Sequence, residues 1–239
     1  MFYKTDKERS FAYSAHTACD PNGFVLGVKV TAGNIHDIVM LKPLVEEIME
    51  RIKTPDYVVA DAGYRSASMS HYFENTEMQL VVPYRNNNKS KGAFRKSNFV
   101  YDSKNKTYTC PEGNTMTEKT VNSDGYITFR CARGVCKNCS KKEECFTKSY
   151  TSRMITRHIW ADAIEKDDIF RKTPEGRLHY SGRKETIERV FADCKEQHGM
   201  RYTRLRGLDK VTQEVYLIFA CMNLKKMINR LKRMRRLAA

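Results

Sequence analysis

The order of the segments in residues 10–84 restricts the fold of this chain more than any other feature. Two runs rich in β-branched and aromatic residues, SFAYSAHTAC and GFVLGVKVTA, flank the turn DPNG at residues 20–23 and predict a β-hairpin. A helical pattern follows, then a short apolar run at 57–60, a second helix and a strand at 80–84. Strands that alternate with helices in this way predict an α/β fold.

Asp61 stands directly after the apolar run, in the sequence VVADAGYRS, and Gly63 lets the backbone turn there. In α/β sheets, ligands bind beyond the carboxyl ends of parallel strands. An Asp at such an end serves as a turn residue or, if further carboxylates converge on it, as a ligand of Mg²⁺ or Mn²⁺. Two such ions can activate an attacking oxygen and stabilise a leaving oxygen on phosphorus.

A second candidate carboxylate, Glu188, lies in the late segment YSGRKETIERVFADCKEQHGMRYTRLRG at 180–207. Glu188 and Lys195 are two helical turns apart, about 10 Å along one face. An apolar stripe of Ile187, Val190, Phe191 and Cys194 borders that face and predicts a half-buried helix. The pattern fits an exposed, salt-bridged helix or a metal-binding Glu in a site that also holds phosphates.

The charge of the chain indicates a polyanionic partner. Lys and Arg outnumber Asp and Glu by 43 to 28, and the net charge is +15. Nucleic acid is the natural partner of such an excess, and a merely basic soluble protein is the alternative. The segment 208–236 predicts a long helix with cations crowded into its last turns, either a solvated helix end or a phosphate-contacting tail.

The sequence offers no membrane partner. No apolar run approaches the roughly 20 residues of a membrane span, and MFYKTDKERSF lacks the apolar core of a signal peptide. We therefore expect a cytoplasmic protein whose eight cysteines are thiols or metal ligands.

Four of those cysteines are closely spaced, in the pattern Cys131-x4-Cys136-x2-Cys139-x5-Cys145. This density predicts a structural tetrathiolate zinc site, in which Cys110 could replace one ligand, or else a set of free thiols. Cys19, Cys194 and Cys221 are spaced for packing in a core.

Taken together, these segments resemble the DDE transposases of bacterial insertion sequences, which have an RNase H-like catalytic core: a mixed sheet flanked by helices. FAYSAHTACDPNGFVLGVKVTAGNIHD is similar to the second and third strands of that core and the start of its first helix. VVADAGYRS is similar to the motif of the second catalytic Asp. Glu188, followed by six residues and Lys195, resembles the end of the family signature.

The resemblance implies roles for individual residues. It places catalysis and Mg²⁺ binding on Asp61 and Glu188. It places DNA contact on Lys195, on Tyr180 and on Arg183 or Lys184 upstream of the Glu; Arg201, Arg204 and Arg206 are candidates for further contacts. The implied activity is DNA strand cleavage and strand transfer on double-stranded transposon ends and target DNA. The complete mobile-element enzyme would be a homo-oligomer associated with the bacterial nucleoid.

One departure from the family pattern bears on activity. The first catalytic Asp of the family lies on a strand ahead of the hairpin, and no residue here matches it. The helical region that binds inverted repeats is also unmatched. We therefore expect a truncated or inactive transposase, with residues 1–85 and 177–239 forming the core and 86–176 a basic, Cys-rich insertion.

Two other functions fit the same sequence. A non-catalytic, zinc-stabilised DNA-binding protein derived from a transposase could regulate an intact enzyme. A standalone RNase H-like nuclease would need a third carboxylate, for which Asp20, Asp37 and Glu185 are the candidates.

Overall fold

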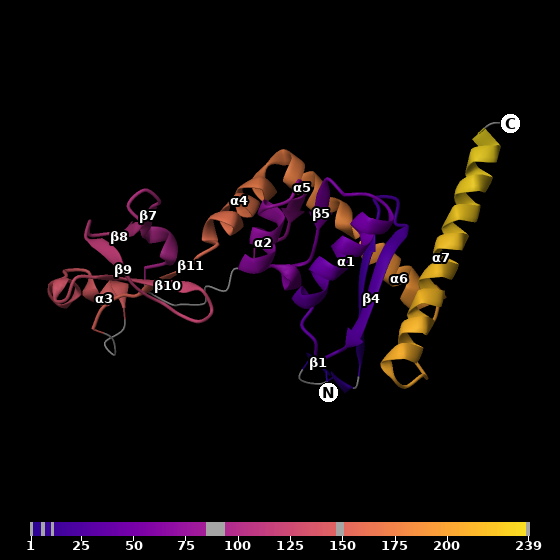
Figure 1. Cartoon of the computed structure of the whole chain (residues 1–239), viewed down its shortest axis with the longest axis horizontal. Helices are drawn as coiled ribbons and strands as arrows, with labels where there is room; N and C mark the ends of the chain where they lie inside the picture. The colour runs from indigo at the N-terminus through magenta and orange to yellow at the C-terminus, as the bar shows by residue number, and fades with distance from the viewer. Residues whose placement is uncertain (1, 6–7, 11, 85–93, 147–150, 238–239) are drawn as a thin grey trace. The chain divides into compact units, whose positions relative to one another are not determined.

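A computed structural model describes residues 2–5, 8–10, 12–84, 94–146 and 151–237. The chain divides into two compact units, the first made of 1–84 and 166–239 and the second of 85–165 (Figure 1). The predicted domain limits at 86 and 176 remain predictions, and the start of the predicted insertion, at 86–93, lies outside the described residues.

The first unit begins with strand pairs. β1 (Phe2–Thr5) pairs with β2 (Glu8–Ser10), and β3 (Tyr13–Cys19) pairs with β4 (Val25–Ala32), both antiparallel. The turn between β3 and β4 closes because Oδ1 of Asp20 accepts the N–H groups of Asn22 and Phe24, at 2.9 and 2.8 Å. Gly23 has a φ of +77°, the left-handed conformation that favours glycine. The predicted hairpin is confirmed, and the Asp20 side chain stabilises the turn that closes it.

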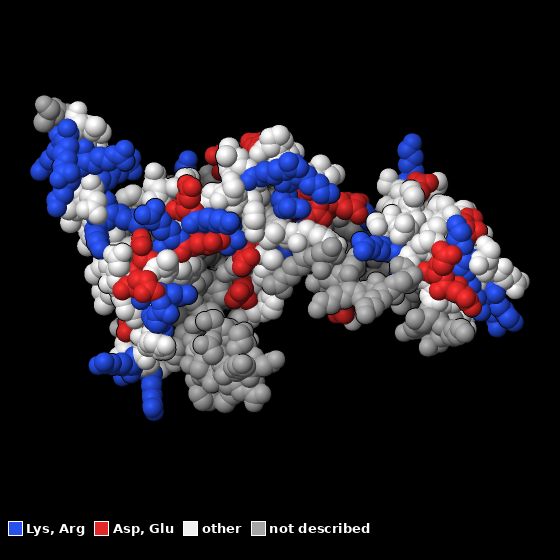
Figure 2. Space-filling model, turned by 180° about the vertical axis from the view of Figure 1, so that it is seen from behind, with Lys and Arg blue, Asp and Glu red and all other residues white. Residues whose placement is uncertain are grey.

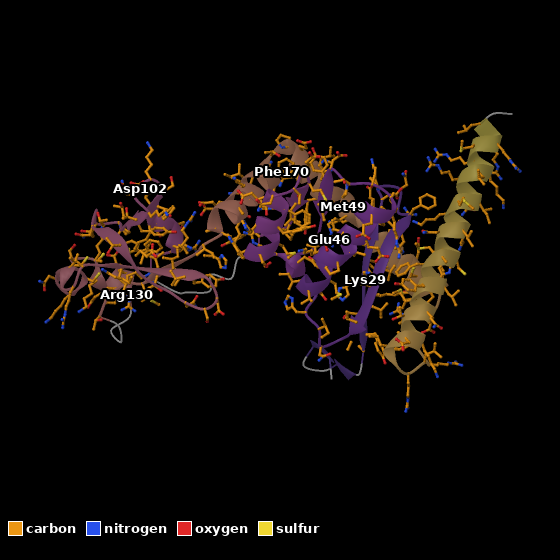
Figure 3. All side chains as sticks on the ribbon, viewed as in Figure 1. Lys29, Glu46, Met49, Asp102, Arg130 and Phe170 are labelled. Carbon is orange, nitrogen blue, oxygen red and sulfur yellow. The ribbon has the colours of Figure 1, made fainter. Side chains whose placement is uncertain are left out.

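Helix α1 (Ile38–Arg51) covers this hairpin and buries Leu41, Leu44, Val45 and Ile48. On its other side, Glu46 accepts a hydrogen bond from the Tyr72 hydroxyl at 3.5 Å, and Met49 packs against the buried cluster that includes Phe73 and Leu80 (Figure 3). Lys29 forms an ion pair with Glu47 of α1. Asp37 is the N-cap residue of this helix, although its side chain makes no capping hydrogen bond.

The next segment is a parallel strand pair with a helix between its strands. β5 (Tyr57–Val59) leads through the 3₁₀ turn η1 (Ala62–Tyr64) and α2 (Ala67–Glu74) to β6 (Gln79–Val81). Val58 lies opposite Leu80 in the parallel register. The α/β class is confirmed. The described strands of this unit pair two by two, so a single RNase H-like sheet stays a proposal.

The remaining helices of the first unit complete its core. They are α4 (Ala161–Lys172), which crosses the unit boundary, α5 (Pro174–Ser181), the 3₁₀ turn η4 (Gly182–Lys184), α6 (Ile187–Gln197) and α7 (Leu208–Leu237). Val190 and Cys194 of α6 are fully buried against Val215 and Phe219 of α7. The predicted apolar stripe and long last helix are thus confirmed. Asn223 fixes α7 to the hairpin by bonding both the N–H and the carbonyl of Val25, each at 2.9 Å.

The second unit is built on an antiparallel sheet in the order β11-β10-β9-β8-β7. The strands are β7 (Val100–Asp102), β8 (Thr107–Thr109), β9 (Thr115–Val121), β10 (Tyr126–Cys131) and β11 (Ile155–His158), with the short helices η2 (Lys96–Asn98), η3 (Val135–Asn138) and α3 (Lys142–Cys145). Met116 and Phe129 are fully buried in its core, with Tyr108 and Ile155 beside them. Alternation along the strands therefore places one face of the sheet inside.

Candidate active site

Asp61 lies where β5 ends and η1 begins. Its extended backbone lets the Oδ1 atom accept the N–H of Ala62 at 2.6 Å, which fixes the direction of the carboxylate. The side chain is 62% exposed, so a cation or another ligand can reach the carboxylate. Placement at the carboxyl end of a parallel strand is what the sequence predicts.

Arg183 brings a distant segment to Asp61. Its Nη1 lies 3.7 Å from Oδ1 of Asp61, and its side chain is only 16% exposed. The same Nη1 donates to the Tyr180 hydroxyl at 3.5 Å, and the guanidinium lies 5.6 Å from the centroid of that ring. Nε of Arg183 is buried and has no hydrogen-bond partner among the described residues. The Tyr180–Lys184 segment therefore adjoins the end of β5.

A buried polar network supports the turn that follows Asp61. His16, 2% exposed, places Nε2 2.9 Å from Oγ1 of Thr31 and Nδ1 3.2 Å from the Tyr64 hydroxyl. Burial lowers the pKa of His16, although the nearby Asp37 opposes this shift. Burial, with the charges of Asp37 and Asp61, raises the pKa of Tyr64 to about 12. Both rings are therefore neutral near pH 7.

Sequence reasoning missed this network. A His within a strand of small and β-branched residues and a Tyr three positions after Asp61 were the available signals. Neither signal identifies its partner, because the contact joins residues 48 positions apart.

Among the candidates for a third carboxylate, Asp37 is placed nearest to this network. Its Oδ1 lies 3.8 Å from Nδ1 of His16. A Cβ added to Gly63 would lie 3.4 Å from Oδ2 of Asp37, an ordinary contact distance, so Asp37 also neighbours the η1 turn. Asp20 serves the hairpin turn, and Glu185 is exposed at the end of η4.

Glu188 lies in the first turn of α6, and both Glu188 and Lys195 are exposed. Glu188 follows Arg183 by five positions, so their Cα atoms are at most about 18 Å apart. Carboxylate oxygens are the donors that Mg²⁺ prefers. Across the described ranges, however, no three His, Cys, Asp or Glu side chains are placed to hold a metal ion.

The remaining predicted DNA contacts lie on the surface. Lys184, Arg204 and Arg206 are exposed, and Arg201 is exposed but paired with Glu196. The last turns of α7 extend beyond the rest of the first unit, and Figure 2 shows Lys and Arg side chains gathered there. This basic end comprises Lys225, Lys226, Arg230, Lys232, Arg233, Arg235 and Arg236.

The cysteine cluster belongs to the second unit. Cys131 and Cys145 are buried, Cys110, Cys136 and Cys139 are half-buried, and all are free thiols. The prediction that Cys221 packs in a core is wrong, because it is exposed on α7, whereas Cys194 is buried.

Comparisons with known proteins point to one family. Two family models, each described as "Transposase DDE domain", match residues 4–105 and 109–228. No curated protein and no solved structure matches the chain. In the part of the chain that the structure describes, no helix is both long enough and apolar enough to span a membrane.

Proposed function

Since the chain belongs to the transposase DDE domain family, we propose that it carries the Asp61 and Glu188 portion of a site for metal-dependent DNA strand cleavage and strand transfer in the movement of an insertion sequence. One observation carries the assignment of the site. Arg183, five positions before Glu188, lies 3.7 Å from the Asp61 carboxylate. The segment that leads into the Glu188 helix therefore adjoins the strand end that presents Asp61.

The proposed metal ligands have the right chemistry. Two exposed carboxylates offer oxygen donors for Mg²⁺ or Mn²⁺, and Asp61 is held in direction by the N–H of Ala62. When bound, the ions would supply Lewis-acid stabilisation of the attacking and leaving oxygens on phosphorus. The buried contacts of Tyr64 would hold the η1 turn, and with it Asp61, in a fixed position.

The cations around this pair are proposed to position the DNA backbone. Lys184 and Lys195 are exposed and can reach phosphates, whereas Arg183 is restrained by Tyr180 and Asp61. Arg204 and Arg206 would add contacts, and Arg201 would have to leave Glu196 to do so. Duplex DNA at transposon ends and at the target is the proposed substrate, handled by a homo-oligomer at the nucleoid.

The resemblance assigns three carboxylates to the complete reaction, in which water attacks a phosphodiester and the freed 3′-hydroxyl attacks target DNA. Only two of them are assigned in this chain, so we propose that it cleaves little DNA when alone. We also propose that its two core segments form an RNase H-like domain interrupted by the Cys-rich unit.

The test separates binding from turnover. We expect Asp61→Asn and Glu188→Gln to keep the affinity for duplex DNA, or to raise it slightly, because each removes a negative charge from a phosphate-binding surface. Any Mg²⁺-dependent nicking should disappear in both variants. Robust nicking that survives both substitutions would contradict the assignment of these residues.

A second candidate function is supported by the basic end of α7. A non-catalytic DNA-binding protein that regulates an intact transposase would need those cations and neither carboxylate. Such a protein keeps its regulatory effect when Asp61 and Glu188 are both neutralised and loses it when the α7 cations are removed.

A further inference from the structure

The second unit gathers its cysteines around one small cavity. Five of them line it, together with Phe99, Met116 and Phe146: Cys110, Cys131, Cys136, Cys139 and Cys145. Burial raises the pKa of the Cys131 thiol, and the neighbouring thiols of Cys136 and Cys110 lie close enough to raise it further. Cys145 lies close enough to Cys110, Cys136 and Cys139 to interact with them electrostatically. Residues up to 35 positions apart in the chain therefore meet at one place.

Two tight turns present three of these cysteines. Cys110 begins a turn in which its carbonyl accepts the N–H of Gly113 at 2.9 Å and its N–H donates to Asn114 at 3.0 Å. Gly113 has a φ of +80°, and Nδ2 of Asn114 lies 3.7 Å from the Cys110 sulfur. A sulfur that accepts a hydrogen bond from its own turn is prepared to carry negative charge.

The second turn holds a pair of cysteines two positions apart. Gly134, with a φ of +91°, precedes η3, and the N–H of Lys137 donates to its carbonyl at 3.1 Å. Cys136 lies within this turn and Cys139 directly follows it. Cysteines separated by two residues are a recurrent half of structural zinc sites.

The other two cysteines differ in their surroundings. Cys145 is the last residue of α3, a helix of one turn, where its N–H donates to the carbonyl of Lys141 at 3.1 Å and its carbonyl accepts Nη1 of Arg153 at 3.3 Å. Cys131 is the last paired residue of β10, opposite Met116 of β9, and its side chain joins the buried core with Met116 and Phe129. The strand ladder thus fixes Cys131 more firmly than the other four.

We propose that this cavity is a structural zinc site in which Cys110, Cys136, Cys139 and Cys145 bind one Zn²⁺, while Cys131 remains a core thiol. Structural zinc is four-coordinate and tetrahedral, so one of five cysteines is left over. As they stand, no three cysteines of the described residues form a coordination shell. Binding requires the side chains on the turns to rotate toward the cavity centre, and each bound thiol to release its proton to water.

This ligand set differs from the four closely spaced cysteines that the sequence favours. It replaces Cys131 with Cys110, which lies on a turn rather than in a strand. The ion would join the β8–β9 turn to the segment that contains η3 and α3. These two parts of the unit are separated in the sequence by β9 and β10. A small unit with a core of few side chains gains much of its stability from such a link.

The experiment uses the full chain, purified without chelator, and measures zinc per chain by elemental analysis. We expect one Zn²⁺ per chain. Single Ser replacements of Cys110, Cys136, Cys139 or Cys145 should each lower the content at least tenfold. Cys131→Ser and Cys221→Ser are the matched controls and should keep it. Zinc below a tenth of an equivalent in the unchanged chain overturns the proposal, as does a Cys131→Ser variant that loses zinc while Cys110→Ser retains it.

A second measurement covers variants that do not fold. Thiols of the unchanged chain are alkylated before and after zinc removal by a chelator, and the modified positions are mapped by mass spectrometry. We expect Cys110, Cys136 and Cys139, which are half-buried, to be protected before chelation and modified after it. Equal modification before and after chelation contradicts the site. Cys221 reports on reagent access, because it is exposed and should react in both samples.

Discussion

Nδ1 of His16 lies 3.2 Å from the Tyr64 hydroxyl, although 48 positions separate the two residues. The contact joins the β3–β4 hairpin to the turn that presents Asp61. His16 is buried and Tyr64 is half-buried, so the position of that turn depends on a polar pair that reaches into the core.

Removing the hydroxyl tests this connection. Tyr64→Phe leaves a buried nitrogen of His16 without its partner, which should lower the free energy of unfolding by about 1–3 kcal/mol. Urea denaturation measures this change. Tyr202→Phe is the control: Tyr202 is 83% exposed, and a change above about 0.5 kcal/mol is not expected there. Equal effects of the two substitutions would count against a structural role of the Tyr64 hydroxyl.

His16 should make stability depend on pH. Its pKa is lowered in the folded protein by burial, so the unfolded chain binds the extra proton first as the pH falls. Stability contributed by the neutral ring is present above about pH 6.5 and declines below it, by at most about 1.4 kcal/mol per pH unit. The decline between pH 7.5 and 5.5 should be smaller in His16→Gln. An identical decline would show that His16 is not the titrating group.

Asp167 should act in the opposite direction. It is 6% exposed, accepts a hydrogen bond from Gln79 at 3.3 Å, and burial raises its pKa to about 6. The folded protein therefore binds a proton more tightly than the unfolded chain, and the stability of the fold falls as the pH rises from about 4 to about 6. Asp167→Asn should stabilise the protein at pH 7 by at most about 3 kcal/mol and remove this trend.

The adjacent residue provides the control for that substitution. Asp168 accepts two hydrogen bonds from Arg65, both at 2.8 Å, so Asp168→Asn should lower stability at pH 7. If Asp167→Asn were also destabilising at pH 7, the prediction would be contradicted. The interactions of the charged Asp167 carboxylate would then outweigh the free-energy cost of its burial.

The basic end of α7 should govern the salt dependence of DNA binding. Replacing Arg233, Arg235 and Arg236 by Gln removes three exposed cations, and the slope of log K against log salt should become shallower by up to about 2.7. Fluorescence anisotropy with a duplex measures the slope. The matched triple variant of Lys104, Lys119 and Arg133 changes the charge equally on the second unit and should leave the slope nearly unchanged. Equal slopes in the two variants would place the DNA elsewhere.

Local patterns predict most of the elements of the first unit. The hairpin, β5, β6 and α7 follow from alternation, apolar runs and helical periodicity, because these depend on neighbours within a few residues. The stripe of α6 is also local, and its two central residues, Val190 and Cys194, are fully buried.

Contacts between distant segments could not be predicted in the same way. The approach of Arg183 to Asp61 depends on how the η4 turn packs beside β5, and no spacing in the sequence encodes it. Aspartate is a residue type that often caps helices, yet the carboxylate of Asp37 makes no capping hydrogen bond and lies beside His16 instead. Cys131 lies at the end of a strand, whereas Cys110 lies in a turn. The spacing of the cysteines in the sequence does not show this difference.

Asp61 and Glu188 are proposed to bind a shared divalent ion. Iron-mediated cleavage of the polypeptide tests this proposal, because Fe²⁺ bound in place of Mg²⁺ reduces added hydrogen peroxide to hydroxide and a hydroxyl radical that cuts the chain near the ion, and added ascorbate returns Fe³⁺ to Fe²⁺. With duplex DNA present, we expect cuts close to both Asp61 and Glu188, suppressed by excess Mg²⁺ and lost together in Asp61→Asn or Glu188→Gln. Cuts near one residue that persist when the other is replaced would contradict it.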